Sequence, residues 1–151
     1  MGMDVYGKNP KSSAGEYFRN NCWHWRPLWR YCEYVAPDIC KKVKYAQSND
    51  GDGLGARDSK ELAKTLETML KTGQTKAYET AYRLQQEALP DEVCEICHGS
   101  GRRVDMSVAN GCNGCAGTGK RRNWDAEYPF SVENVEEFVA FLKECGGFKI
   151  C

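Results

Sequence analysis

The sequence predicts an α-rich α+β fold, a small helical domain with a ribbon-like hairpin inserted between a helical hairpin and the C-terminal helix. Three observations carry this prediction. Apolar residues recur at helical spacing in several segments. Paired cysteines, each followed by glycines, interrupt these segments between residues 94 and 119. Residues 148–151 follow two glycines and favour a short final strand.

The first elements are indicated by capping residues and prolines. Residues 1–12 show no periodicity and are expected to be irregular. Ser13 begins the capping-box pattern SAGE, which predicts a short helix over residues 14–21. Pro27 suits the first turn of a second helix, and Pro37 ends it. The apolar stripe of that helix comprises Leu28, Trp29, Cys32, Val35 and Ala36.

The middle of the chain predicts a loop followed by two helices. Residues 48–58, SNDGDGLGARD, are rich in glycine and polar side chains and favour a loop. The next two segments, 59–73 and 75–89, have helical spacing, and Gly73 separates them. A connection this short predicts an antiparallel helical hairpin. The residues expected to face inward are Leu62, Leu66, Met69, Leu70, Ala77, Tyr78, Ala81, Tyr82 and Leu89.

The last helix is predicted over residues 131–147, SVENVEEFVAFLKECGG. Ser131 is the expected N-cap, and the two glycines end the helix. Its apolar stripe comprises Val135, Phe138, Val139 and Leu142. Because no linker of domain-boundary type is found, we expect a single domain over 1–151 with an insertion at 94–122.

The insertion repeats one short phrase, CEICHGSG and then CNGCAGTG, whose first cysteines are 18 residues apart. Two residues between cysteines let both sulfurs point to one centre, and the glycines allow positive φ just beyond. Two such knuckles supply four thiolates, the ligand set of a structural zinc site. The sequence therefore predicts one structural zinc in a zinc ribbon, with His98 exposed. Its ligands are Cys94, Cys97, Cys112 and Cys115.

The repeat resembles the cysteine-rich region of DnaJ-type chaperones, whose signature is CxxCxGxG. The resemblance covers Cys94 to Gly119. That family carries four repeats and two zinc ions, whereas this chain has two repeats and lacks the His-Pro-Asp of the J-domain. The resemblance thus implies one zinc and no recruitment of Hsp70. The whole chain also resembles small bacterial, prophage and phage proteins that combine SNDGDGL-like and SVENV…CGGF-like segments with such a ribbon.

Basic residues lie next to the cysteines and allow two interpretations. They can contact phosphates, which makes direct nucleic-acid binding the alternative function. They can also simply offset the charge of −2 that zinc carries with four thiolates. Only Trp124 is available nearby for base stacking. The residues concerned are Arg102, Arg103, Lys120, Arg121 and Arg122.

The segment RNNCWHWRPLWRYCEY combines tryptophans, tyrosines and arginines and predicts a binding surface on the helical body. Such side chains suit flat anionic ligands, including nucleotides, and they suit protein partners equally well. The polar loop that follows supplies acceptors for sugar hydroxyls, although neither register of it completes a calcium-binding EF-hand loop. The predicted ligand residues are Arg19, Trp23, Trp25, Arg26, Arg30, Asn49, Asp50 and Asp52.

Composition narrows the function classes. Lysine plus arginine equal aspartate plus glutamate at 21 each, so no global field attracts nucleic acid or an anionic membrane. No signal-peptide, membrane-spanning, GxSxG, Walker or HExxH pattern is present. We therefore expect a cytoplasmic, non-enzymatic, zinc-stapled binding protein, in the host cytoplasm if a phage encodes it. Its expected partner is a nucleotide-like molecule or a protein, as for a phage accessory protein directed against host defence.

Overall fold

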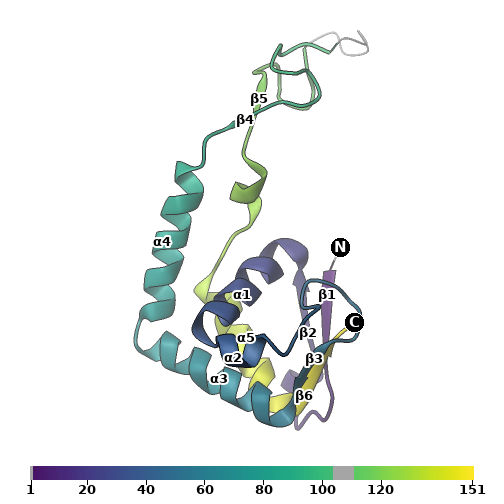
Figure 1. Cartoon of the computed structure of the whole chain (residues 1–151), viewed down its shortest axis with the longest axis vertical. Coiled ribbons are helices and arrows are strands. Elements are labelled where there is room, and N and C mark those ends of the chain that lie inside the picture. The colour runs from purple at the N-terminus through teal and green to yellow at the C-terminus, as the bar shows by residue number, and fades with distance from the viewer. Residues whose placement is uncertain (1, 104–110) are drawn as a thin grey trace. The chain divides into compact units, whose positions relative to one another are not determined.

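The computed structural model describes residues 2–103 and 111–151 and confirms the α+β class (Figure 1). The chain divides into two compact units. The first comprises Met1–Arg83 and Tyr128–Cys151 and is called the body here. The second comprises Leu84–Glu127 and is called the cysteine unit.

The body contains a four-stranded sheet and most of the helices. Its strands are β1 (Gly2–Gly7), β2 (Tyr17–Asn21), β3 (Gly53–Gly55) and β6 (Gly147–Ile150). Its helices are α1 (Cys22–Val35), α2 (Pro37–Cys40), α3 (Ala56–Lys71) and α5 (Val132–Glu144), with a 3-10 turn at Ser13–Gly15. Helix α4 (Gln74–Ala88) begins in the body and ends in the cysteine unit. The cysteine unit adds β4 (Glu92–Val93), β5 (Lys120–Arg121) and a 3-10 turn at Trp124–Glu127.

The sheet has the strand order β2-β1-β6-β3, and every neighbouring pair is antiparallel. Val5 of β1 lies opposite Phe18 of β2 and Ile150 of β6, so the apolar residues of the three strands share one face. Leu54 of β3 lies opposite Phe148 and extends the same face. The short strand expected at the end of the chain is thus β6, which pairs on both sides within the sheet.

Helices α1, α3 and α5 cover the apolar face, and the core is rich in aromatic rings. Trp25 stacks on Trp29 with ring centroids 5.6 Å apart and meets Phe138 edge-on at 5.7 Å. Phe138 in turn contacts Phe148 of β6 at 6.1 Å. All four side chains are fully buried. The predicted stripe of α5 is confirmed, and Ser131 caps the helix by accepting from the N–H of Asn134 at 3.2 Å.

The expectations for residues 1–12 and 14–21 were wrong. Half of the first segment, Gly2–Gly7, is strand β1, and residues 17–21 are strand β2 rather than a helix. Ser13 caps nothing and lies in the 3-10 turn that joins these strands. The physical reason is that alternate residues of both strands are buried, which suits a sheet with one covered face. The pairing of β1 with the distant strand β6 stabilises that sheet. A local capping pattern cannot compete with that pairing.

Helix α1 begins at Cys22, five residues before the expected start at Pro27. The side chain of Asn21 is the N-cap and accepts from the N–H of His24 at 2.9 Å. Pro27 therefore lies inside the helix, in its second turn, where its ring is buried. As expected, α1 ends before Pro37, which then starts α2.

The two middle helices are present, but they do not form the expected antiparallel hairpin. Helix α3 begins at Ala56, and the expected loop also contains strand β3. Instead of pairing with α4, α3 packs along α5. The chain turns at Gly73, which has φ of 77°, and α4 then departs from α3 (Figure 1). Consequently Ala77 and Ala81 are exposed, although both were expected to face inward.

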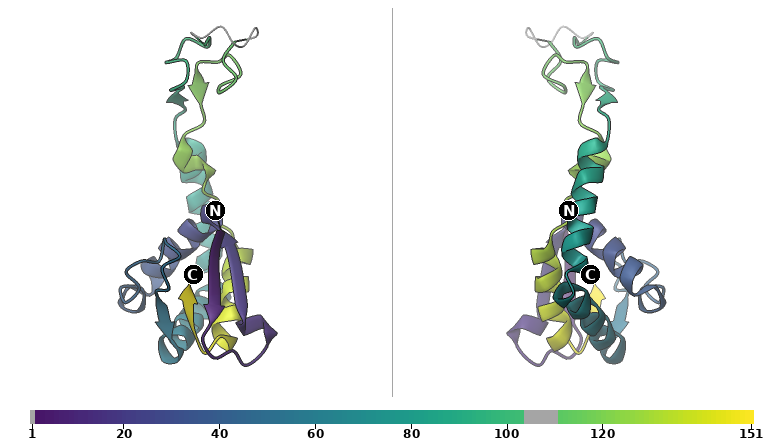
Figure 2. Two further views of the ribbon diagram at one scale, coloured as in Figure 1. Left: turned by 90° about the vertical axis from the view of Figure 1, so that its right-hand side faces the viewer. Right: turned by 90° about the vertical axis from the view of Figure 1, so that its left-hand side faces the viewer.

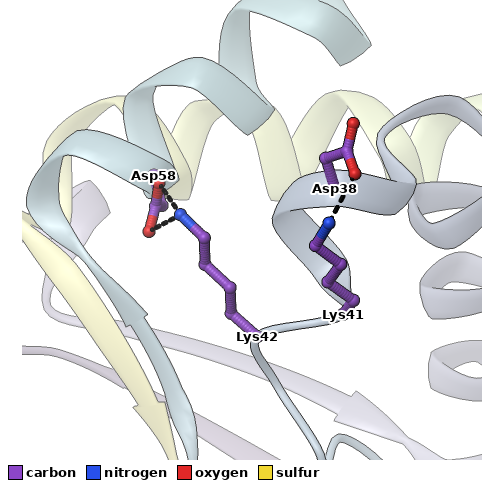
Figure 3. A network of polar contacts seen from close by, with 4 residues as sticks. All are labelled: Asp38, Lys41, Lys42 and Asp58. Atoms are coloured by element: carbon purple, nitrogen blue, oxygen red, sulfur yellow. Dashed lines mark hydrogen bonds and ion pairs between the residues drawn. The ribbon is translucent and has the colours of Figure 1, made fainter.

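Two ion pairs lie on the surface near the end of α2 and the start of α3 (Figure 3). Lys42 lies 2.8 Å from both carboxylate oxygens of Asp58 in the first turn of α3. Lys41 lies 2.6 Å from Asp38 within the same short segment. Asp58 is thereby engaged by an ammonium group.

No helix within residues 2–103 and 111–151 combines the length and the apolar character needed to cross a bilayer.

Candidate metal centre and binding surfaces

Four buried cysteine sulfurs converge in the cysteine unit. The sulfurs of Cys94, Cys97, Cys112 and Cys115 all lie within 4.8 Å of one another. Cys94 is 3.9 Å from Cys112, and Cys97 is 3.7 Å from Cys115. A tetrahedral zinc ion with Zn–S bonds of about 2.3 Å separates its sulfurs by about 3.8 Å. The cluster therefore has the dimensions of a site for one metal ion, and zinc fits its donor set.

The two halves of the repeat pair reciprocally through the backbone. The N–H of Cys94 donates to the carbonyl of Gly119 at 2.9 Å. The N–H of Cys112 donates to the carbonyl of Gly101 at 2.7 Å. The first cysteine of each half is therefore bonded to the closing glycine of the other half. This exchange is why both copies of the phrase are needed.

Within each knuckle a backbone amide supports the second sulfur. The N–H of Gly101 donates to Sγ of Cys97 at 3.3 Å, and the N–H of Gly119 donates to Sγ of Cys115 at 3.2 Å. These amides are oriented by positive φ, 73° at Gly101 and 76° at Gly119. A Cβ at Gly119 would lie 2.3 Å from the carbonyl oxygen of Gly99, so only glycine fits there. Such N–H groups stabilise thiolates rather than thiols.

The surroundings of the four thiols shift the pKa values of Cys112 and Cys115 in opposite directions. Desolvation raises the pKa of Cys112 to about 11. Desolvation also acts to raise the pKa of Cys115, but the N–H of Gly119 and the neighbouring thiols bring it down to about 6. The N–H of Gly119 thus favours the thiolate form of Cys115, and the thiolate is the form that binds a cation.

The cysteine unit has no hydrophobic core of its own. Among its described residues, the only buried side chains of apolar type are those of the four cysteines. Val93, Ile96 and Trp124 are instead exposed. A metal ion bound to four thiolates would replace the missing core. His98 is exposed, as expected, and is not part of the sulfur cluster.

The basic residues of the ribbon have unequal surroundings. Arg122 donates to the carbonyls of Leu89 at 3.1 Å and Gln86 at 2.6 Å and lies 3.9 Å from Asp91. Its guanidinium thus caps the carbonyl groups at the C-terminus of α4 and has a structural role. Arg103 donates to Asn113 at 3.2 Å.

Three basic side chains of the ribbon point into solvent, those of Arg102, Lys120 and Arg121. None of them has a side-chain partner among the described residues. A surface hollow beside β4 and β5 brings two of the arginines next to acidic side chains, so its charge is balanced. The hollow is lined by Glu92, Val93, Glu95, Arg121, Arg122 and Trp124.

Several residues of the predicted ligand set have internal roles instead. Trp25 is fully buried, and its indole N–H donates to the carbonyl of Ala46 at 2.7 Å, so it presents no stacking face. Asp52 accepts from the backbone N–H groups of Lys44 at 2.7 Å and Tyr45 at 2.9 Å. These bonds contribute to a lowered pKa of Asp52, the Tyr45 N–H most of all, and keep its carboxylate ionised.

The remaining loop residues are also engaged. Asn49 donates from its side chain to the carbonyl of Gly2 at 3.0 Å. Asp50 accepts from the hydroxyl of Ser48 at 2.5 Å. Arg19 lies on β2 and pairs with Asp4 rather than joining the arginines of α1. The structure does not gather these residues into one pocket with Trp23 and Arg26.

The structure does gather Trp23, Arg26 and Arg30, along the outer side of α1. Arg26 donates to the hydroxyl of Tyr128 at 2.9 Å and lies 5.5 Å from the centre of its ring. Trp23 contacts the same ring with centroids 4.8 Å apart. One helical turn further on, Arg30 is exposed beside Tyr78. Burial raises the pKa of Tyr78, and the positive charge of Arg30 opposes that rise.

Further tyrosines extend this surface. Tyr34 is 73% exposed, and its ring lies 5.8 Å from that of Tyr78. Tyr78 stacks with Tyr82 at 6.1 Å, and the Tyr82 hydroxyl donates to the carbonyl of Tyr128 at 2.7 Å. We call the whole set the α1 surface. It comprises Trp23, Arg26, Arg30, Tyr34, Tyr78, Tyr82 and Tyr128.

Sequence reasoning missed the contribution of Tyr34 and Tyr128 to this surface. Tyr34 lies four residues after Arg30 and eleven after Trp23, so helical spacing alone would have placed it on their side. No local signal connects Tyr128 to α1. No protein-family model, curated protein or solved structure matches the chain. The function must therefore be argued from these sites.

Proposed function

We propose that the protein is a zinc-stapled, non-enzymatic binding protein whose α1 surface binds a flat anionic ligand of the nucleotide class. The observation that carries the proposal is the cluster along α1 in which Arg26 contacts the ring and hydroxyl of Tyr128 beside Trp23, followed by the exposed Arg30 near Tyr78. Aromatic faces stack on bases, and guanidinium groups give forked, charge-assisted bonds to phosphate. The zinc-binding cysteine unit has a stabilising role in this proposal.

The contacts of the α1 surface support a prearranged site. Arg26 is held by the hydroxyl and ring of Tyr128, so its side chain loses little freedom when a ligand binds. Arg30 makes no ion pair with any described residue, which leaves its donors available. Trp23 is half-buried against Tyr128 and so adds an indole ring beside Arg26.

The absence of catalysis is part of the proposal and has physical support. One ring nitrogen of His24 is bonded to the side chain of Asn21 at 2.8 Å. Burial raises the pKa of Cys32 well above its usual range and that of Cys40 to about 12, which makes both thiols poor nucleophiles. The resemblance to phage and prophage proteins makes a nucleotide-derived immune signal in the host cytoplasm a candidate ligand.

A nucleotide screen by thermal unfolding tests this function. A ligand present at 100 times its Kd should stabilise the protein by about 2.7 kcal/mol, which raises Tm by roughly 5–11 °C for a domain of this size. Arg30→Gln should weaken binding by about 10- to 150-fold because a charge-assisted bond is lost. Arg57→Gln, an exposed arginine on α3, is the matched control and should leave the shift unchanged.

Two results would contradict the small-molecule version. If no mono-, di- or cyclic nucleotide raises Tm, the α1 surface is not a nucleotide site. If Arg30→Gln also abolishes capture of a stoichiometric protein partner, the same surface serves as a protein interface. Equal Tm shifts in wild type and Arg30→Gln would move the binding site away from α1.

Nucleic-acid binding by the ribbon is the second candidate, and the exposed Arg102, Lys120 and Arg121 favour it. Changing these three residues to Glu should abolish retention on DNA or RNA at about 50 mM salt, because the phosphate contacts are lost. Each lost contact should also reduce the slope of log K against log salt by about 0.7–0.9. Arg122 is left unchanged because it closes α4. Unchanged retention of this triple variant, measured by gel shift, would exclude the ribbon as the nucleic-acid site.

A further inference from the structure

The sheet of the body has a second face that no helix covers within the part of the chain that the structure describes. Residues alternate along each strand, so burial of Met3, Val5 and Phe18 leaves their neighbours on the opposite side. Figure 2 (left) looks onto this opposite face, with α5 behind the strands. We call it the open face. Its side chains are those of Asp4, Tyr6, Tyr17, Arg19 and Lys149.

Two tyrosines and a lysine form a row across three strands of the open face. Tyr6 of β1 lies opposite Tyr17 of β2 and, on its other side, opposite Lys149 of β6. The two rings are 4.9 Å apart between centroids, and each tyrosine is 42% exposed. Gly53 of β3 lies opposite Lys149 and ends the row without a side chain. The row is therefore an aromatic pair bordered by a cation.

A second row of side chains on the open face, next to the first, orients one of the two tyrosines. Asp4 lies opposite Arg19 in the register, and their side chains form an ion pair at 3.8 Å. The hydroxyl of Tyr17 donates to the carboxylate of Asp4. Asp4 therefore orients the ring of Tyr17 and is itself neutralised by Arg19. Lys149 makes no ion pair with any described residue, so the open face carries a net charge of one cation.

We propose that the open face binds single-stranded nucleic acid, with Tyr6 and Tyr17 stacking on bases and with Lys149 and Arg19 contacting phosphates. Stacking on aromatic side chains is tolerant of sequence, because every base has a π face. Aromatic side chains on the face of a sheet are a known platform for unpaired bases, which can be splayed out of a duplex and stacked on them. The exposed aromatic pair next to cationic side chains favours a partner that combines planar rings with negative charge, as nucleic acid does. This site is separate from the α1 surface, so it stands independently of the function proposed above.

Fluorescence anisotropy with a labelled 15-nucleotide oligouridine at about 50 mM salt tests the proposal on the full, zinc-loaded protein. Tyr6→Leu and Tyr17→Leu should each weaken binding by about 5- to 150-fold, the loss expected for one stacked base. Lys149→Gln should reduce the slope of log K against log salt by about 0.7. Tyr45→Leu and Lys60→Gln are matched controls, since both residues are exposed elsewhere on the body, and they should change neither quantity.

Four outcomes would overturn the proposal. The first is no oligouridine binding at low salt. The second is equal affinity of Tyr6→Leu, Tyr17→Leu and wild type, with far-UV circular dichroism confirming that all are folded. The third is binding lost only in the ribbon triple variant, which would place the nucleic acid on the cysteine unit. Preference for the matching duplex over the single strand would also contradict stacking on unpaired bases.

Discussion

Replacing Cys97 by Ser should remove the metal and unfold the cysteine unit while the body stays folded. The sulfur of Cys97 is one of the four that converge on the candidate metal centre. A hydroxyl is a much poorer zinc ligand than a thiolate, and the remaining three sulfurs leave one tetrahedral position open. Binding free energies of structural zinc in zinc-finger peptides are about 10–16 kcal/mol at about pH 7, so we expect loss of the metal to have a large effect on the cysteine unit.

The local character of the effect follows from the separation of the two buried clusters. The four cysteines form one cluster, and the aromatic and aliphatic core of the body forms another. No further apolar side chain is fully buried among the described residues of the cysteine unit, so nothing remains to hold it without metal. The body retains its sheet and the helices that cover it. Loss of metal should therefore produce partial, not global, unfolding.

Metal analysis and limited proteolysis measure both parts of this prediction. Wild type should carry one zinc per chain, and Cys97→Ser should carry none and be cleaved within residues 94–122. Cys22→Ser, at a half-buried cysteine outside the centre, is the matched control and should keep the metal. Acid should act like the substitution, because protons compete with zinc for the thiolates and affinity falls as pH falls. A metal-free Cys97→Ser protein with wild-type resistance to protease would refute the structural role.

The parts of the fold that were predicted correctly depend on local chemistry. Ser131 caps α5 because a side-chain oxygen reaches an N–H only three residues ahead. The spacing of the cysteines and glycines likewise specifies each knuckle within a few residues. Strand β1 could not be predicted in this way, because it lies between β2 and β6, and β6 lies at the other end of the chain. Contacts of such sequence separation leave no signature in a single segment.

In the predicted ligand site, the error likewise arose from a misplaced helix start. The helix was expected to start at Pro27, so Trp23 and Trp25 were given the same role. Asn21 is the true N-cap, and extending the helix to it changes the assignment. Trp25 then lies three and four residues before Leu28 and Trp29, on the buried side. Trp23 falls on the outer side with Arg26 and Arg30. One missed N-cap thus separates a core residue from a candidate ligand residue.

Trp25→Ala should be among the most destabilising substitutions in the body, whereas Trp23→Ala should cost little stability. Truncating a fully buried tryptophan costs about 3–5 kcal/mol through lost burial and the cavity left behind. The carbonyl of Ala46 would also lose the indole N–H that it accepts from at 2.7 Å. Total stabilities are about 5–15 kcal/mol, so this loss is a large share of the whole. Trp23 is only half-buried against Tyr128, and its removal leaves no closed cavity.

Urea denaturation followed by circular dichroism compares the two variants directly. Trp25→Ala should lower the midpoint strongly, and Trp25→Phe should recover most of the loss, because a ring still fills the space beside Trp29 and Phe138. The remaining deficit of Trp25→Phe, roughly 1 kcal/mol, measures the bond to Ala46. Trp23→Ala should instead keep the midpoint and lose nucleotide stabilisation. If the two alanine variants had equal midpoints, the assignment of Trp25 to the core and Trp23 to the α1 surface would be wrong.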